Sequence, residues 1–110
     1  MKLIKLLSFC VASFISSNVI AGTYVIVDAT IEAVGNTSGN KANFYVRTTG
    51  GAGPCVGQQI TFPEADASNP NAHQRAYSAA LMALSSGMKV KIHNYFSDSC
   101  DRASFIEVIK

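Results

Sequence analysis

The stretch AYSAALMALSSGMKVKIHNY, residues 76–95, changes its periodicity in the middle, at Gly87. Before Gly87, apolar residues recur at the three- and four-residue spacing of an amphipathic helix, whereas after it apolar and polar residues alternate as in a half-buried strand. Glycine after the last turn of a helix adopts the left-handed conformation without a steric penalty. The stretch therefore predicts one helix that turns directly into a strand.

Residues on either side of Gly87 indicate where these two elements begin and which way they face. Asn69 is a good N-cap and Pro70 fits the first helical turn, so the helix is expected to begin there. Its predicted core-facing residues are Tyr77, Ala80, Leu81 and Leu84. In the strand that follows, the residues expected to face inward are Met88, Val90 and Ile92, and those expected to face outward are Lys89, Lys91 and His93.

Four further strands are predicted, three before the helix and one at the C-terminus. They cover residues 23–34, 41–48, 59–64 and 103–109, and the first is expected to bury its odd positions from 25 to 33. The order of three strands, one helix and two strands matches the OB-fold. We therefore predict a mainly β protein with one helix, folded as a five-stranded OB-like barrel. An α+β meander with the helix on one face of the sheet is the alternative.

The N-terminal residues have the order typical of a secretory signal peptide. Lys2 and Lys5 precede an apolar run over residues 6–15, and small residues lead to Ala21. The apolar run is shorter than the roughly 20 residues that a membrane-spanning helix needs. We therefore expect a signal peptide over residues 1–21 with cleavage near Ala21, no stable membrane anchor, and a secreted or periplasmic bacterial protein.

The charge balance of residues 22–110 is neutral. Without Lys2 and Lys5, the nine Lys and Arg become seven, which equals the seven Asp and Glu. A nucleic-acid-binding protein needs a basic excess to neutralise phosphates, so the composition argues against a nucleic-acid partner. The length predicts a single domain over residues 22–110.

Cys55 and Cys100 are the two cysteines that follow the predicted signal peptide. In an exported protein such a pair is typical of a disulfide. No CxxC motif or cluster of histidines accompanies them, so we expect no metal site and no cofactor. The glycines of TGGAGPCVG, residues 49–57, are expected to serve turns and the disulfide.

The C-terminal part of the chain resembles small secreted bacterial proteins of uncharacterised function. The motifs that carry this resemblance are the helix AYSAALMAL, the turn at Gly87, the strand KVKI, the loop SDSC and the ending IEVIK. The order of elements is also similar in topology to the cell-binding B subunits of bacterial AB5 toxins, which are pentameric OB-folds that bind glycans. This second likeness implies a glycan ligand and a homo-oligomer, although the chain has no Trp to form the floor of a sugar pocket.

The polar faces of the second and fourth strands carry the candidate ligand-binding residues. These are Tyr45, Arg47, Lys89, Lys91, His93 and Tyr95. Aromatic rings beside hydrogen-bond donors suit a sugar or a peptide. Charged residues on strands also prevent edge-to-edge pairing, so a solvated face without a ligand is the alternative.

The sequence contains no set of residues typical of an active site. His73 and His93 have the chemistry of a general base, but neither has a partner close in the sequence. Asp98 and Asp101 flank Cys100 without the ligand spacing of a calcium loop. We therefore predict a non-enzymatic exported binding module whose ligand is a glycan or a protein. The alternatives are an oligomeric structural or assembly subunit and a small hydrolase.

Overall fold

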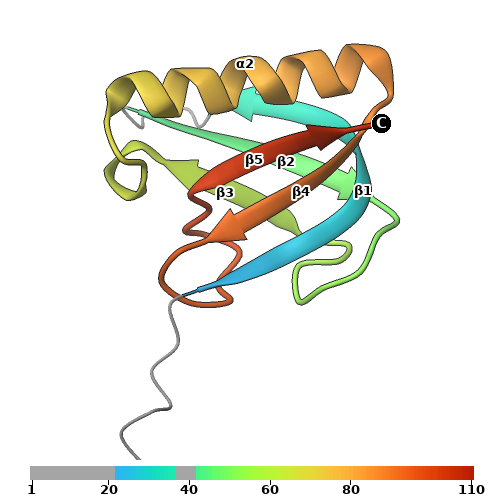
Figure 1. Ribbon diagram of the computed structural model, residues 1–110, viewed down its shortest axis with the longest axis horizontal. Helices are drawn as coiled ribbons and strands as arrows, with labels where there is room; N and C mark the ends of the chain where they lie inside the picture. Colours follow the sequence, from blue (N-terminus) through green and yellow to red (C-terminus); the bar gives the residue numbers. More distant parts are fainter. Residues whose placement is uncertain (1–21, 37–41) are drawn as a thin grey trace, which may run out of the picture.

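The computed structural model of the protein describes residues 22–36 and 42–110. The predicted signal peptide, residues 1–21, and most of the predicted turn at residues 35–40 lie outside the described residues. The elements in chain order are β1 (Thr23–Asn36), β2 (Asn43–Thr49), β3 (Gln59–Pro63), the 3-10 helix η1 (Glu64–Asp66), α2 (Pro70–Ser86), β4 (Lys89–Asn94) and β5 (Phe105–Ile109). The predicted order of three strands, a helix and two strands is confirmed (Figure 1).

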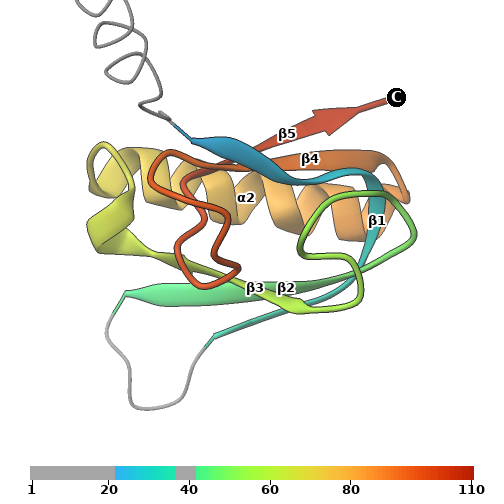
Figure 2. The same ribbon diagram turned by 90° about the horizontal axis from the view of Figure 1, so that it is seen from below.

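The five strands form one antiparallel sheet in the order β3-β2-β1-β4-β5. The sheet bends at β1, so that β2 and β3 lie opposite β4 (Figure 2). The sheet does not close into the predicted barrel, because β3 and β5 stand at its two ends and do not pair. Helix α2 packs across the sheet and contacts β1 and β5.

The β4–β5 loop, residues 95–104, occupies the side of β3 where a closing strand would lie. The Thr61 N–H donates to the carbonyl of Cys100 at 2.8 Å, and the Ala103 N–H donates to the carbonyl of Thr61 at 3.0 Å. The backbone of the loop therefore bonds to both the N–H and the carbonyl of Thr61 on the outer edge of β3. β5 begins only after this loop, on the far side of β4, which explains why the barrel stays open.

β1 pairs with two different strands along its length. Residues 23–30 pair with β4 and residues 30–36 pair with β2. Three register shifts interrupt these ladders, and Asp28, within one of them, has a positive φ of 61°. Each shift places one extra residue in β1, which bends the strand and exchanges its inward and outward faces.

The prediction that the odd positions of β1 face inward is therefore wrong over part of the strand. Val25 and Ile26 are both fully buried, although they are adjacent in the sequence. Ala33 lies opposite the exposed Arg47, whereas Val34 packs against the core. The register shifts are the reason, because a simple alternation assumes an uninterrupted ladder.

The glycine-rich β2–β3 loop, residues 50–58, lies beside the first half of β1, where β2 has ended. Val27 and Ala52 exchange two backbone hydrogen bonds of 2.9 and 3.0 Å, and the Cys55 N–H donates to the carbonyl of Val25 at 2.9 Å. Gly53 allows this close approach, because it has a φ of +126° and a Cβ there would lie 2.6 Å from the carbonyl oxygen of Val25. Its lack of a side chain thus serves close backbone packing as well as the turn.

Helix α2 begins and ends as predicted. The Asn69 side chain accepts a hydrogen bond from the Ala72 N–H at 2.8 Å, and Pro70 is the first helical residue. Gly87 has a left-handed φ of 73°, and its N–H donates to the carbonyl of Ala83 at 2.9 Å. These local signals depend only on neighbouring residues, which is why the sequence reveals them.

The face that α2 buries differs from the predicted one. Leu81 is 42% exposed and Leu84 is 38% exposed, whereas Tyr77 is partly buried against the core. The buried helical residues are His73, Ala76, Ala80 and Ala83. Small side chains let the helix backbone lie close to the sheet, and the larger leucines then fall to the flank of the helix.

A disulfide joins the two loops that line the open side of the sheet. Cys55 of the β2–β3 loop and Cys100 of the β4–β5 loop have their Cα atoms 5.8 Å apart and form the predicted bridge. Arg102 adds a second tie, because its Nε and Nη2 donate to the two carboxylate oxygens of Asp66 at 3.2 and 3.0 Å. These hydrogen bonds raise the pKa of Arg102 and hold the β4–β5 loop against η1.

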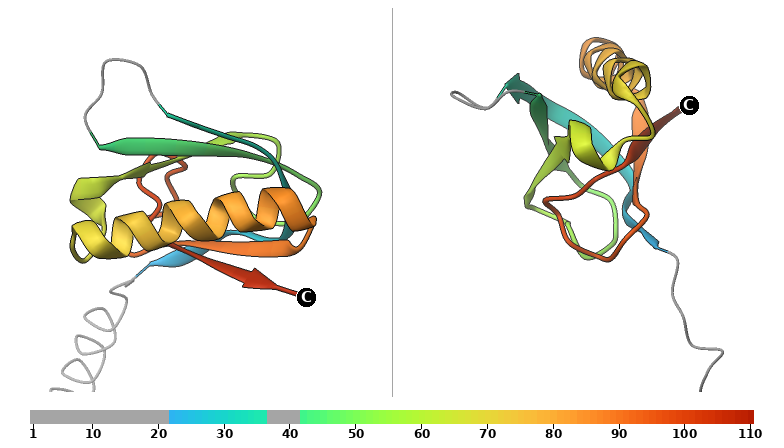
Figure 3. Two further views of the ribbon diagram at one scale, coloured as in Figure 1. Left: turned by 90° about the horizontal axis from the view of Figure 1, so that it is seen from above. Right: turned by 90° about the vertical axis from the view of Figure 1, so that its left-hand side faces the viewer.

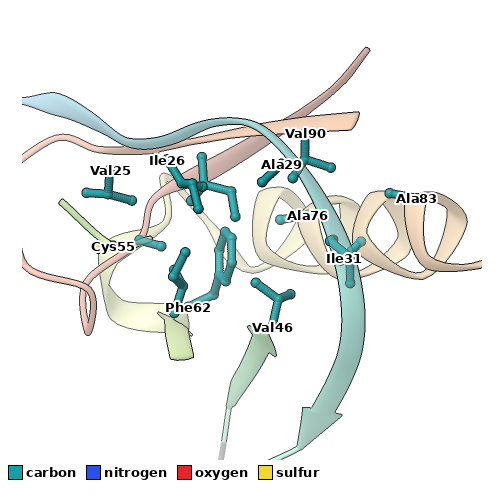
Figure 4. Packing of buried hydrophobic residues seen from close by; sticks show 14 of the residues in the cluster. Val25, Ile26, Ala29, Ile31, Val46, Cys55, Phe62, Ala76, Ala83 and Val90 are labelled. Carbon is teal, nitrogen blue, oxygen red and sulfur yellow. The ribbon is translucent and has the colours of Figure 1, made fainter. Parts of the chain in front are cut away.

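The apolar core lies between the two halves of the bent sheet and beneath α2 (Figure 4). Phe44 and Phe62 stack on one another with ring centroids 4.5 Å apart. Ile26 of β1 and Val46 of β2 are both fully buried in the same cluster. In the part of the chain that the structure describes, no helix has the length and apolarity needed to cross a membrane.

Asn94 is a fully buried polar residue at the end of β4. Its Oδ1 accepts hydrogen bonds from the N–H groups of Phe96 at 2.7 Å and Ser97 at 3.1 Å, and its Nδ2 donates to the carbonyl of Ser99 at 2.9 Å. One side chain thus supplies three partners to the backbone of the β4–β5 loop. Asn94 therefore fixes the start of the loop that covers β3.

Candidate functional site

The six predicted ligand-binding residues fall on two separate parts of the sheet. Tyr45 of β2 lies opposite Gly35 near the end of β1, whereas His93 of β4 lies opposite Tyr24 near its beginning. Eleven positions of β1 separate these two points, and β1 bends between them, so Tyr45 and His93 belong to opposite halves of the bent sheet (Figure 2). The structure therefore does not bring the predicted residues into one site.

The β2 part consists of Tyr45 and Arg47. The ring of Tyr45 covers Gly35, because a Cβ on that glycine would lie 2.5 Å from the Tyr45 hydroxyl oxygen. An aromatic side chain that covers a glycine on the neighbouring strand stabilises the pairing of the two strands. This structural role is sufficient to explain why a tyrosine occupies position 45. Arg47 is exposed between Ala33 and Gln59 on the adjacent strands.

The β4 part belongs to a larger cluster, which we call the outer aromatic face: Tyr24, Lys91, His93, Tyr95 and Phe105. Tyr24, His93 and Phe105 lie in one row across β1, β4 and β5, because each is the register partner of the next. His93 stacks on Phe105 with ring centroids 5.0 Å apart and an interplanar angle of 15°, and it forms a T-shaped pair with Tyr24 at a centroid distance of 4.8 Å. Tyr95 approaches His93 at 5.0 Å and Phe105 at 5.7 Å.

The outer aromatic face combines exposed rings with polar groups. Tyr95 is 49% exposed and Tyr24 is 37% exposed. The ammonium of Lys91 lies 4.9 Å from the centroid of the Tyr24 ring, which is within the range of a cation–π interaction. The Nδ1 atom of His93 is buried and has no hydrogen-bond partner among the described residues. Rings thus form the platform, and the Lys91 ammonium is the donor beside it.

Lys89 lies outside this cluster, although it shares a face of β4 with Lys91. It pairs with Thr30 of β1 and with Ile109 at the far end of β5. Of the six predicted residues, Lys91, His93 and Tyr95 are therefore brought together, and Tyr45, Arg47 and Lys89 are not. The difference between Lys89 and Lys91 supplies a matched pair for mutagenesis.

Tyr24 and Phe105 were not predicted as members of the site. Tyr24 precedes the regular part of the first predicted strand, and Phe105 belongs to a strand with apolar residues on both faces. Their common signal is that each is an aromatic residue at the beginning of a strand. That signal is informative only once the register is known, because the register aligns both residues with His93.

The remaining candidate residues have structural surroundings. His73 is buried, and its Nε2 donates to the carbonyl of Phe62 at 2.8 Å, which links α2 to β3. Its ring centroid is 5.2 Å from that of Phe44 in the core. Asp98 and Asp101 lie exposed in the β4–β5 loop. Within residues 22–36 and 42–110, no group of three or more His, Cys, Asp or Glu side chains is arranged to hold a metal ion.

Comparison with protein families identifies the group to which the chain belongs. The model of DUF5992, a family of unknown function, matches residues 4–110, so the chain is a member of that family. This agrees with the resemblance to uncharacterised proteins and adds no activity to it. Searches of curated proteins and of solved structures found no match.

Proposed function

We propose that this member of DUF5992 is an exported, non-enzymatic binding module that holds a carbohydrate against the outer aromatic face. The observation that carries the proposal is the pair of exposed rings, Tyr24 and Tyr95, that bracket His93 beside the Lys91 ammonium. The apolar face of a sugar stacks on aromatic rings, while its hydroxyls accept hydrogen bonds from neighbouring donors. The face offers both kinds of contact within one row of side chains.

Export is part of the proposal and has two supports. The order of residues 1–21 is typical of a signal peptide. The bridge between Cys55 and Cys100 is of a kind that persists in the periplasm or outside the cell, where thiols are not kept reduced. We therefore place the mature protein in the periplasm or the surrounding medium.

We also propose that the fold is an opened relative of the OB-fold. The strand order β3-β2-β1-β4-β5, with α2 between β3 and β4, supports this reading, because an OB barrel has the same order closed by a β3–β5 pair. The likeness to AB5 toxin B subunits would then be one of distant topology. Fold likeness of this kind is a weak guide to function, so the carbohydrate proposal depends on the aromatic face alone.

A glycan array probed with the purified, fluorescently labelled protein tests the carbohydrate proposal. Loss of the Tyr95 ring in Tyr95→Ala is expected to weaken glycan binding about fivefold, the equivalent of one aromatic contact. Lys91→Ala is expected to weaken it as well, whereas Lys89→Ala serves as the matched control and is expected to bind normally. Absence of any glycan above background, or equal effects of the two lysine variants, would contradict the proposal.

A second candidate function is that of an oligomeric structural subunit. It is favoured by three large apolar residues that α2 exposes: Leu81, Met82 and Leu84, between 38% and 51% exposed. Such side chains gathered on one helix are typical of surfaces that another protein covers. Sedimentation velocity separates the two functions, because a subunit of this kind associates at micromolar concentration and Met82→Ser then weakens the association. A protein that remains monomeric rules this second function out.

A further inference from the structure

The two edges of the sheet differ in how they are covered. The outer edge of β3 receives two backbone hydrogen bonds at Thr61 from the β4–β5 loop. β5 is the last strand at the other end of the sheet, and in the described part of the chain only β4 pairs with it. Figure 3 shows β5 at the margin of the molecule beside α2. An uncovered strand edge presents a row of backbone donors and acceptors that another extended chain can pair with.

A groove of about 310 Å³ runs between α2 and the first half of β5. Its helical wall is made of three alanines, Ala72, Ala76 and Ala79. Its opposite wall contains Phe105 and Ile106 at the start of β5. The small helical side chains leave room for an incoming side chain next to the free edge of the strand.

Arg75 gives the groove a positive charge that the chain itself does not neutralise. It is exposed and lines the groove on the helical side. All seven Asp and Glu of the chain lie within residues 22–36 and 42–110, and the one ion pair they form there joins Asp66 to Arg102. The groove therefore complements a ligand that carries a carboxylate.

We propose that β5 and α2 form a docking site for an extended peptide segment of another protein. The peptide adds to β5 as a further strand of the sheet, with main-chain hydrogen bonds to the free edge. One of its apolar side chains enters the groove beside Ala79, and a carboxylate, either the C-terminus or an acidic side chain, pairs with Arg75. The groove shares Tyr95 and Phe105 with the outer aromatic face, but Ala79 and Arg75 lie outside that face, so variants of these two residues test the inference separately from the carbohydrate proposal.

A second copy of this chain is a poorer occupant of the same edge. Two copies of β5 related by a two-fold axis pair all five residues, Phe105–Ile109, only in the register that is centred on Glu107. That register places Glu107 directly opposite Glu107 of the other copy, and like charges in this position are destabilising. A peptide with apolar residues and a carboxylate avoids this repulsion.

Synthetic peptides test the inference directly. The probe is a set of labelled hexapeptides in which Val or Ile alternates with Thr or Ser, each made with a free C-terminal carboxylate and as the C-terminal amide. Binding to the purified full chain is measured by fluorescence polarisation. We expect members of the set to bind, and we expect the amide forms to bind up to about fivefold more weakly, the effect of losing one exposed ion pair.

Three variants separate docking in the groove from unspecific adhesion. Ala79→Glu fills the groove and repels the carboxylate, so it is expected to abolish binding, and Arg75→Glu is expected to weaken the carboxylate forms more than the amides. Ser78→Glu is the matched control, because it adds the same charge to an exposed position of the same helix next to the groove. Circular dichroism of all three variants verifies that the helix is retained.

Hydrogen exchange provides the second measurement, because it locates the bound peptide. Backbone amides of residues 105–109 are expected to gain protection when the peptide binds, and those of β3 are expected to remain unchanged. Failure of every hexapeptide to bind, or equal losses in Ala79→Glu and Ser78→Glu, would overturn the inference. Protection of residues 105–109 that grows with protein concentration in the absence of peptide would also overturn it, in favour of pairing between two copies.

Discussion

Breaking the Cys55–Cys100 bridge is expected to remove about 4 kcal/mol from the free energy of unfolding. The bridge closes a loop whose ends are 45 residues apart in the sequence. The loss of unfolded-chain entropy for such a loop, 2.1 + 1.5R ln n cal/mol/K, corresponds to about 4 kcal/mol at room temperature. For a domain of this size the loss lowers the melting temperature by roughly 20 °C.

Urea unfolding of the oxidised and the reduced protein measures this difference. The experiment uses residues 22–110, whose only cysteines are Cys55 and Cys100, so reduction changes no other pair of thiols. Reduction keeps both sulfur atoms in place, whereas a Cys55→Ala/Cys100→Ala variant also leaves a cavity at the fully buried Cys55, so the variant is expected to be less stable than the reduced protein. The slope of the unfolding free energy against urea is expected to rise on reduction, because the unfolded chain expands.

The result that refutes the reasoning is a difference of less than about 1 kcal/mol between the oxidised and reduced proteins, far below what the chain-entropy treatment gives. It would mean that the two loops are held together by their backbone hydrogen bonds and that the bridge adds little. Hydrogen exchange at Thr61 and Ala103 distinguishes the two cases. Their amides bond across the open side of the sheet, and they are expected to exchange faster in the reduced protein.

Three further changes in stability follow from the packing, each measured by urea unfolding. Gly53→Ala is expected to cost about 2 kcal/mol more than Gly57→Ala. Gly53 has a φ of +126° and a carbonyl oxygen 2.6 Å from the added Cβ, whereas a Cβ on Gly57 would meet no atom within 4 Å. Equal costs would contradict the close approach of the loop to β1. Leu81→Ala is expected to cost less than about 1 kcal/mol, because Leu81 is exposed. Ala80→Leu is expected to cost roughly 1–3 kcal/mol, because position 80 is fully buried. The reverse order of costs would mean that the helix buries Leu81 in place of Ala80. Asn94→Ala is expected to cost about 3 kcal/mol, because three backbone groups of the β4–β5 loop lose their partner; a cost below about 1 kcal/mol would show that water replaces it.

The features that depend on short stretches of sequence were predictable. The Asn69 cap, the turn at Gly87 and the alternation in β2 and β4 are each determined by residues within a few positions of one another. The pairing of Cys55 with Cys100 was predictable for a different reason, since no other cysteine follows residue 21. These features specify the elements and one long-range contact.

The inward faces were less predictable, because they depend on how the elements meet. The stripe of Leu81 and Leu84 is as helical as that of Ala76, Ala80 and Ala83, and hydrophobicity alone favours the leucines. The structure buries the alanines, which allow a closer approach of α2 to the sheet. In β1 the register shifts exchange the inward and outward faces of the strand, and no local sequence motif predicts these shifts.

The candidate site was predictable in part. The alternation of β4 places Lys91 and His93 on one face, and Tyr95 continues it beyond the strand, so these three were identified together. The register of three strands is needed to add Tyr24 and Phe105. The same register separates Tyr45 and Arg47 from the others, because β1 pairs with β2 and β4 along different halves of its length.

The open side of the sheet connects the stability of the fold with the proposed docking site. In a closed OB barrel β3 and β5 pair, so the β5 edge is used inside the fold. Here the β4–β5 loop bonds to β3 at Thr61, and the bridge between Cys55 and Cys100 joins this loop to the one beside β1. Because loops and a covalent bond hold that side together, the fold does not need β5 to close it. The edge of β5 is thereby left free next to the groove of α2, where an extended peptide can pair with it.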